Sequence, residues 1–271
     1  APHEAEQVEQ EQELLLEIGL EVDRIDRARL AIRAIPAILR GADAERLVRD
    51  FDSAIYDLRA TSELRSGHVS MAVVPSVATN LLPDIIKTFA IEFPGIKLHL
   101  DDDSSRGVQH RVESNEVDFG IGSMWNPNKV LQFTPLFADN LELICHRDHA
   151  LAQNTGAIGW DQLNQATFLD TGITKALRAR QDLGESKFDF PNITTLLAML
   201  KSNLGVSVLP SLAIPKAAAD LLSRPLIPTE TSEIYLITRK DWTLSPAAEA
   251  MIETIIRETP QQVKKYALTL L

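Results

Sequence analysis

The sequence predicts an α/β protein with two Rossmann-like lobes and a ligand cleft between them, preceded by N-terminal helices. Strand-like and helix-like segments alternate from residue 68 onward, a polar stretch near the middle separates two such blocks, and most of the first 66 residues have a helical pattern. We therefore expect an acidic helical segment at 1–42, a second helix at 43–66 and two α/β lobes from residue 67 onward.

Residues 10–40 are predicted to be helical because they are rich in helix formers and carry spaced apolar residues. Gly41 suits the end of this helix, and Asp43 suits the start of a second one. The second helix carries an apolar row at spacings of four, three and four that is typical of helix pairing: Leu47, Phe51, Ala54 and Leu58. Periodicity alone leaves open whether this row packs on the chain's own core or on a partner helix.

From residue 68 the expected elements alternate, with apolar residues two apart in strands and three or four apart in helices. The expected strands are 68–73, 96–100, 117–121, two within 131–146, 166–169, 188–190, 206–209 and 234–238. The expected helices are 76–93, 105–114, 174–182, 193–204, one near 212–219, and 247–258. This alternation indicates largely parallel sheets.

The composition argues against several classes of protein. The formal net charge is −11, and residues 1–23 hold eight acidic residues and no Lys or Arg. Phosphate contacts need clustered basic residues, so residues 1–66 give no support for DNA binding. No window approaches the roughly 18 apolar residues of a membrane span. The single cysteine, Cys145, excludes an internal disulfide and suits a reducing compartment, so we expect a cytoplasmic protein without membrane contact.

The stretch DDDSSRG at 101–107 could suggest a metal or phosphoryl-transfer site. Neighbouring side chains of an extended segment point to opposite faces, so Asp101–Asp103 are not expected to converge on one ion. We expect these carboxylates to be solvated or bonded to backbone. His146 and His149 lack a further ligand for zinc, and Cys145 ends an apolar run typical of a buried residue. We therefore expect no metal, no cofactor and no enzymatic activity.

Polar residues at the starts of expected helices indicate a ligand site instead. Helix starts gather at the carboxyl edge of parallel strands, where free backbone N–H groups favour an anion. The residues in question are Pro75-Ser76, Ser104-Ser105, Thr171-Gly172, and Asn192 with Thr194-Thr195. Taken singly, each could instead be only a helix cap.

Five runs, in this order, resemble one known family: GHVSMAVVPSVATNLLPDIIKTFAIEFPGIKLHL, VESNEVDFGI, LQFTPLFADNLELICHRDHALA, LLAMLKSNLGVSVLPSLAI and YLITRKDWTLSPAAEAMIETI. Over about residues 67–258 the chain resembles the effector-binding region of LysR-type transcriptional regulators. The resemblance implies the type 2 periplasmic binding fold and a small anionic effector between the lobes. It implies that lobe I consists of 67–147 together with 237–271, and lobe II of 148–236. It also implies a linker helix at 43–66 that pairs with a neighbour's in a homodimer or homotetramer. Residues 1–40 depart from the family, because they show no trace of its basic winged helix-turn-helix.

The resemblance also implies which residues contact the effector. They fall in the first strand-to-helix loop, the second loop and the opening loop of lobe II: Pro75, Ser76, Val77, Ser104, Ser105, Thr171, Gly172, Ile173 and Thr174. Ser105 stands 13 residues before Asp118, a separation typical of a contacting Ser or Thr in this family.

Two other functions remain open for this fold. One is a free-standing solute-binding protein without DNA-binding activity. The other is an enzyme, as in hydroxymethylbilane synthase-like architectures, although no reactive cysteine or carboxylate group favours it. The linker-like helix favours the regulator.

Overall fold

The computed structural model describes residues 21–24, 30–34, 64, 66–127, 129–214 and 219–271. The chain divides into two compact units, Ala1–Ser66 and Gly67–Leu271. None of the helices in these ranges combines the length and the apolar character needed to cross a membrane.

The described part of the first unit is a pair of antiparallel strands, β1 (Glu21–Arg24) and β2 (Leu30–Ala34), with Val22 opposite Ile32. The helix predicted over 10–40 is therefore wrong at these residues. Leu30 and Ile32 stand two positions apart, which is the period of a strand, and the helical pattern was not continuous there. The apolar row at Leu47, Phe51, Ala54 and Leu58 lies outside the described residues.

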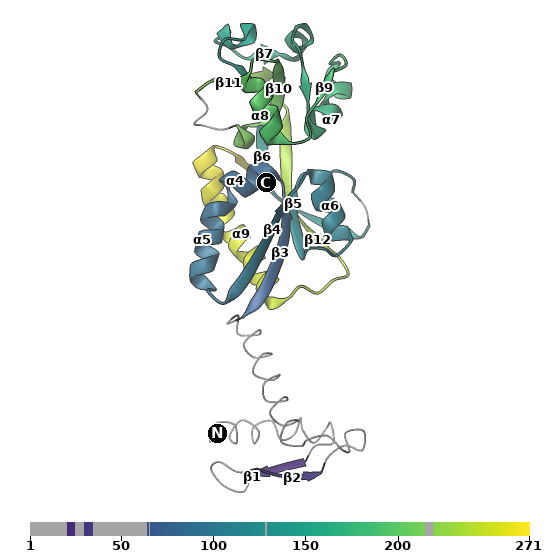
Figure 1. The fold of residues 1–271 in the computed structure, drawn as a ribbon, viewed down its shortest axis with the longest axis vertical. Helices are drawn as coiled ribbons and strands as arrows, with labels where there is room; N and C mark the ends of the chain where they lie inside the picture. Colours follow the sequence, from purple (N-terminus) through teal and green to yellow (C-terminus); the bar gives the residue numbers. More distant parts are fainter. Residues whose placement is uncertain (1–20, 25–29, 35–63, 65, 128, 215–218) are drawn as a thin grey trace. The chain divides into compact units, whose positions relative to one another are not determined.

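Lobe I is built on a sheet in the order β4-β3-β5-β12-β6. β3 runs parallel to β4 and β5, and β12 runs antiparallel to β5 and β6. Figure 1 shows α5 and α9 on one side of this sheet and α6 on the other. The strands are β3 (Gly67–Val73), β4 (Ile96–Asp102), β5 (Phe119–Gly122), β6 (Leu131–His146), β12 (Thr231–Arg239) and a short β13 (Thr269–Leu270). The helices are α4 (Pro75–Asn80), α5 (Leu82–Glu92), α6 (Ser105–Glu113) and α9 (Pro246–Tyr266).

Lobe II surrounds the second half of β6, which pairs antiparallel with β10 and β11. Its strands are β7 (Ile158–Gly159), β8 (Leu169–Asp170), β9 (Phe188–Asp189), β10 (Val206–Pro210) and β11 (Leu221–Ile227). Its α-helices are α7 (Gly172–Gln181) and α8 (Ile193–Lys201), and its 3₁₀ helices are η2 (Ala150–Gln153), η3 (Trp160–Gln165) and η4 (Ser211–Ala213). The predicted two-lobed α/β architecture is confirmed.

β6 belongs to both lobes. Its residues 131–140 pair with β12, and its residues 141–146 pair with β10 and β11. The sequence predicted two strands here, but one strand of 16 residues passes the irregularity beside Pro135. Proline cannot donate to a sheet, so the ladder is offset there while the strand continues. The pairing partners of β6 thus change between residues 140 and 141, and the lobe boundaries at 147/148 and 236/237 stay a prediction.

Other elements differ at prolines. The single helix predicted over 76–93 is two helices, α4 and α5, because Pro83 lies in the first turn of α5 and has no N–H to continue an earlier helix. α9 runs on to Tyr266 through the exposed Pro260. β7 and β11 were not predicted, and Pro225 interrupts the apolar pattern of β11. The helix predicted near 212–219 is only η4 in the described residues.

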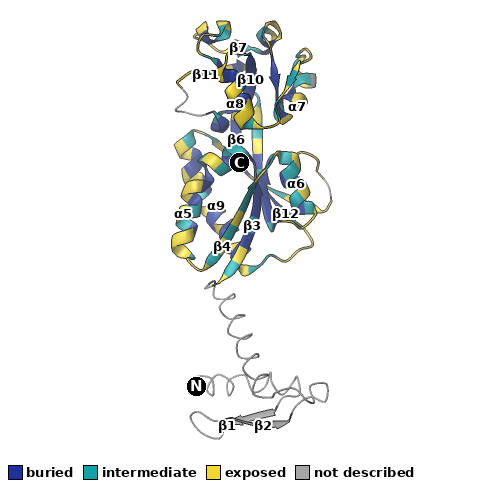
Figure 2. Cartoon of the chain, in the orientation of Figure 1, coloured by how far each residue is buried: buried dark blue, intermediate teal, exposed yellow. Residues whose placement is uncertain are grey.

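The central strands of lobe I are buried on both faces, as Figure 2 shows in dark blue. The largest fully buried side chains of lobe I include Phe89 of α5 and Phe119, Phe137 and Met71 of the strands. Lobe II has two apolar clusters, one around Trp160 and Phe168 and one around Leu196 and Leu200. Each lobe thus has its own core, and the segments between the cores are free to form a binding site.

Candidate functional site

A cavity of about 920 Å³ lies where the two lobes meet. Ligand pockets usually have volumes of about 300–1,000 Å³, so a small organic molecule fits here. Its walls come from the starts of α4, α6, α7 and α8, the segment after β5, the end of β10 and the first half of β12.

Seven of the nine predicted contact residues line this cavity: Pro75, Ser76, Ser104, Ser105, Thr171, Gly172 and Ile173. Val77 and Thr174 do not, and both are fully buried. Val77 turns into the core because it lies on the inner side of α4. The Thr174 hydroxyl bonds to Thr171 and Asp170 at the base of α7. The structure therefore corrects these two assignments.

Several of the polar residues at these helix starts are N-caps. The Ser104 hydroxyl accepts from the Gly107 N–H at 3.2 Å, and the Asn192 amide oxygen accepts from two N–H groups of α8. Thr171 and Thr174 form a reciprocal capping box on α7. Helix capping therefore accounts for these side chains, as in the interpretation that takes each of them as a cap and not as a ligand contact.

Ser105 and Ser76 differ from the capping residues. The Ser105 hydroxyl accepts from the Ser123 N–H at 3.3 Å, which leaves its own proton free to donate. The Ser76 hydroxyl has no hydrogen bond to any residue in the described ranges. Both hydroxyls are therefore available to a molecule in the cavity.

The three aspartates of the DDDSSRG stretch stay outside the cavity lining. Asp101 and Asp103 lie 3.4 and 3.3 Å from the guanidinium of Arg111, and Asp103 also accepts from the Ser104 N–H at 2.7 Å. Asp102 is exposed. Among the described residues, no group of three His, Cys, Asp or Glu side chains could hold a metal ion. Arg111 thus pairs with two of the three carboxylates outside the cavity lining.

The position of the Asp103 carboxylate explains why residue 107 is a glycine. A Cβ added at residue 107 would lie 2.2 Å from the Asp103 carboxyl carbon. A Gly107→Ala variant is expected to lose about 1 kcal/mol of unfolding free energy, because the carboxylate must leave the Ser104 N–H and Arg111. In an Asp103→Ala background the same change is expected to stabilise by about 0.5–1 kcal/mol, since Gly is the poorer helix former. Urea denaturation of the four proteins gives both values, and an equal cost in both backgrounds would contradict this explanation.

Sequence reasoning missed the charged residues of the cavity. Arg106, the second residue of α6, is exposed and forms no ion pair with any described residue. Lys175 pairs with Asp189, and Arg180 lies 3.6 Å from Glu230. Of the described cations that line the cavity, Arg106 is therefore the one without an ion pair. Its place directly after two serines at a helix start was the signal that could have found it.

The remaining acid in the cavity, Glu233, is engaged by a neighbour. The Tyr235 hydroxyl donates to its carboxylate, and this hydrogen bond together with burial raises the pKa of Tyr235. Tyr235 therefore stays protonated near neutral pH, and its hydroxyl continues to donate a hydrogen bond to the Glu233 carboxylate.

The segment after β5 forms an apolar rim. Met124 and Trp125 line the cavity and are 40% and 50% exposed. The buried Gln109 holds this segment, because its amide oxygen accepts from the N–H groups of Trp125 and Asn126 at 3.2 and 3.1 Å. The rim is thus fixed to α6, the helix that also carries Ser105 and Arg106.

Cys145 and the two histidines have local roles. Cys145 is fully buried opposite Val206, as predicted, and burial raises the pKa of its thiol. The His149 ring caps η2 by accepting from the Leu151 N–H at 3.2 Å, and burial lowers the pKa of this histidine. The His146 ring lies 3.6 Å from Asp148. All three lie outside the cavity lining.

A two-lobed α/β domain with a cavity between its lobes is a small-molecule-binding domain. The family model for the LysR substrate binding domain matches residues 62–260, and this chain belongs to that family. It thus carries the effector-binding domain of a LysR-type regulator, with the type 2 periplasmic-binding-like fold. A second model, the MutL C terminal dimerisation domain, matches residues 1–78.

The relatives and solved structures agree with this assignment. The uncharacterized HTH-type transcriptional regulator YbhD of Escherichia coli is 29% identical over 224 residues, which span 79% of this chain and 70% of the relative. The effector binding domain of QuiR in complex with shikimate superposes with a TM-score of 0.65 at 15% identity, covering 72% of this chain and 98% of that one. The regulatory domain of Synechocystis PCC6803 CcmR in complex with 2-PG gives 0.65 at 21% identity, with coverages of 72% and 98%. Both of these solved structures therefore have the same fold as the matched part of this chain.

Proposed function

We propose that the domain senses a small anion, such as a carboxylate, bound between the lobes. The observation that carries this proposal is Arg106, which lines the cavity without an ion pair in the described residues, although the chain has a net charge of −11. Beside it, the first N–H groups of α6 and the Ser105 hydroxyl are donors, and donors at a helix start stabilise negative charge. The backbone N–H groups of Gly172 and Ile173, in the first turn of α7, are the donors from lobe II.

A ligand that contacts both lobes favours the arrangement in which both sets of donors reach it. Such a ligand shifts the equilibrium between arrangements only by the difference in its affinity for them. The donors of α6 belong to lobe I and those of α7 to lobe II. An anion between them therefore favours a closed arrangement, in which the two lobes come close enough for both sets of donors to reach it. In a regulator, this shift in the arrangement of the lobes changes the contacts between subunits.

The partners of the full regulator follow from the family. We expect a homodimer or homotetramer in the cytoplasm, with the row at Leu47, Phe51, Ala54 and Leu58 in the contact between subunits. The match of residues 1–78 to a dimerisation domain supports an oligomer. The relatives are HTH-type regulators, so DNA is the expected target, whereas the acidic residues 1–23 do not suit a DNA contact.

The alternative is a free-standing solute-binding protein of the same fold. In an electrophoretic shift assay at moderate salt, retardation of duplex DNA by the chain would favour the regulator, because a solute-binding protein has no reason to bind DNA. An enzyme is not favoured, since the relatives are transcriptional regulators. Formation of a product from any small carboxylate incubated with the chain would favour an enzyme instead.

Binding is tested by a thermal-shift screen of small carboxylates with the full chain. A ligand that binds only the native state raises the unfolding temperature by mass action. Ser105→Ala and Arg106→Gln are each expected to weaken binding of the best carboxylate about tenfold or more, because a charge-assisted hydrogen bond contributes roughly 1.5–3 kcal/mol. Isothermal titration calorimetry gives the two dissociation constants.

The matched control is Arg257→Gln, which removes an exposed arginine that pairs with Glu92 and Glu258 and does not line the cavity. This variant should bind the carboxylate as the unaltered chain does. An unchanged dissociation constant in Ser105→Ala and Arg106→Gln would refute the site.

A further inference from the structure

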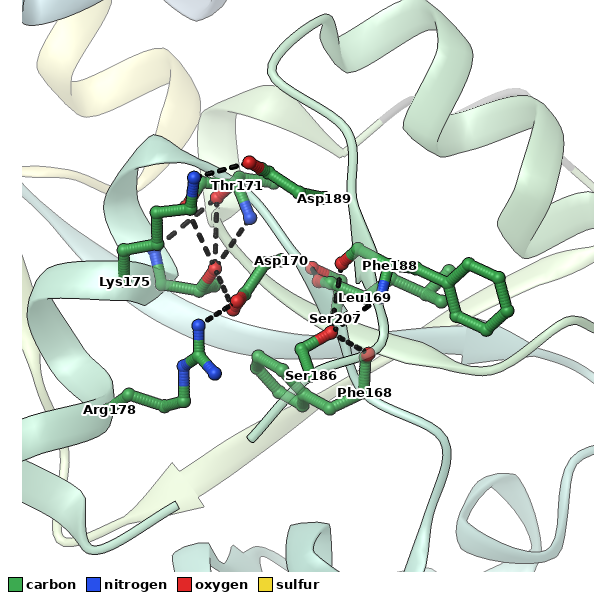
Figure 3. A network of polar contacts seen from close by, with 11 residues as sticks. Phe168, Leu169, Asp170, Thr171, Lys175, Arg178, Ser186, Phe188, Asp189 and Ser207 are labelled. Atoms are coloured by element: carbon green, nitrogen blue, oxygen red, sulfur yellow. Dashed lines mark hydrogen bonds and ion pairs between the residues drawn. The ribbon is translucent and has the colours of Figure 1, made fainter. Parts of the chain in front are cut away.

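Asp170 is a buried carboxylate immediately before α7. Its side chain is 3% exposed, and it receives two contacts from α7: the Thr174 hydroxyl donates to Oδ1 at 3.1 Å, and Arg178 forms an ion pair with Oδ2. Figure 3 shows Asp170 and Arg178 pointing toward each other. One carboxylate thus holds the first two turns of the helix.

The contacts of Asp170 leave the opposite side of α7 for the cavity. Thr174 and Arg178 are four residues apart and share one face of the helix. Neither of them lines the cavity, whereas six other residues of this segment do: Thr171, Gly172, Ile173, Lys175, Leu177 and Arg180. The rotation of α7 about its axis therefore decides where its cavity-facing donors point.

Asp170 is itself fixed to the body of lobe II. Its carbonyl accepts from the Phe190 N–H at 2.9 Å, and the carbonyl of the preceding Leu169 accepts from the buried Ser207 hydroxyl of β10 at 2.7 Å. Figure 3 also shows Ser186 bonded to the neighbouring Phe168 carbonyl, at 2.5 Å. The carboxylate is therefore a fixed point relative to the lobe.

Stability alone is a weak reason for such a pair. The desolvation of a buried ion pair offsets much of its attraction, and apolar side chains of similar volume often serve as well. Fixed orientation is a stronger reason, since a binding site gains affinity when its donors are held in place before the ligand arrives. We propose that Asp170, through Thr174 and Arg178, is a positioning residue that sets α7 for effector binding. This inference rests on the proposed function, because the α7 donors matter only if an anion binds between the lobes.

The first measurement needs no ligand. Hydrogen exchange of the full chain, followed by mass spectrometry, is expected to be at least about fivefold faster in α7 for Asp170→Asn than for the unaltered protein, with lobe I unchanged. The Arg178→Lys variant, which keeps the charge, should restore most of the protection that Arg178→Met loses. Arg224→Met is the control, because Arg224 bonds to the Ala152 and Asn154 carbonyls and, among the described residues, to no residue of α7. Unchanged exchange in α7 of Asp170→Asn would overturn the proposal.

The second measurement is affinity for benzoate and for inorganic phosphate, by calorimetry. Loss of a supporting partner behind a ligand-binding group costs about 10–100-fold at metal sites, and we expect about tenfold here for Asp170→Asn. Arg178→Lys should bind more tightly than Arg178→Met, and Arg224→Met should bind normally. Faster exchange in α7 with unchanged affinity would reduce Asp170 to a structural residue and overturn the proposal. If the unaltered chain binds neither anion, the proposed function fails for these anions, and the exchange result alone decides whether Asp170 sets α7.

Discussion

Gly205→Ala is expected to destabilise the Gly67–Leu271 unit by at least about 3 kcal/mol, at the upper end of the range for overpacked cores. Gly205 is buried directly before β10, and a Cβ at this position would lie 2.0 Å from the carbonyl oxygen of Thr167. That oxygen also accepts from the Val206 N–H at 2.9 Å. The added methyl group therefore has to push one backbone segment away from another.

The damage should extend beyond one hydrogen bond. Phe168 and Val206 form the bridge that joins the segment before β8 to β10, and the Ser207 hydroxyl bonds to the Leu169 carbonyl one residue further on. Separation of the two segments weakens all of these contacts, which also support the start of α7. Equilibrium urea denaturation measures the loss.

Gly156→Ala is the matched control for this substitution. A Cβ there would meet no atom within 4 Å, so a change of less than about 0.5 kcal/mol is expected. A Gly205→Ala protein as stable as this control would mean that the backbone approach at Thr167 is not tight.

The sequence predicted the elements whose patterns are local. β3, α6 and β10 combine a clear apolar period with a capping or turn residue, and the structure has them within a few residues of the expected limits. β11 escaped prediction because Pro225 breaks its apolar run, although this exposed proline opposes Glu142 in the sheet. The two strands near residues 21–34 escaped because the composition of that segment favours a helix.

The candidate site divides in the same way. Ser104 and Thr171 could be found because a polar residue after a strand and before a helix is a local signal. Met124 and Trp125 carry no such signal, and they reach the cavity only because the buried Gln109 holds their backbone. Lys175 and the β12 residues likewise come to the cavity through tertiary packing. The prediction also counted residues one or more positions beyond a helix start as ligand contacts. Val77 and Thr174 were predicted as contacts for this reason, although they do not line the cavity.

A contact between the lobes beside the cavity adds a constraint that no local pattern encodes. Leu212 in η4 is held at both of its backbone groups: its N–H donates to Asp139 at 2.9 Å, and its carbonyl accepts from the Asn80 amide at 2.9 Å. Asp139 also accepts from the Ser211 hydroxyl at 2.5 Å. Pro210 and Ala213, on either side of these residues, line the cavity. The position of η4 therefore depends on side chains of α4 and β6.

Asp139→Ala is expected to lower the unfolding free energy by about 3 kcal/mol, because it leaves the Leu212 N–H and the Ser211 hydroxyl without their acceptor. Asp139→Asn should cost less at neutral pH, since its oxygen still accepts from Leu212 and no charge is buried. Burial is the largest influence on Asp139 and raises its pKa, against the opposing effect of its hydrogen bonds. An acid whose pKa is higher in the folded state stabilises that state at low pH, and this stability is lost as the pH rises through the folded-state pKa.

The cost of Asp139→Asn relative to the unaltered chain should therefore shrink as the pH rises from about 4 to about 8. Urea denaturation of both proteins at these two pH values measures the difference, and the comparison cancels the titration of every other group that the substitution leaves unaffected. Asp102→Asn is the control, because Asp102 is exposed at the end of β4, the edge strand of lobe I, and its loss should cost little unfolding free energy. A cost of Asp139→Asn that grows with pH would mean that the charged carboxylate stabilises the contact at η4 by more than its burial opposes it.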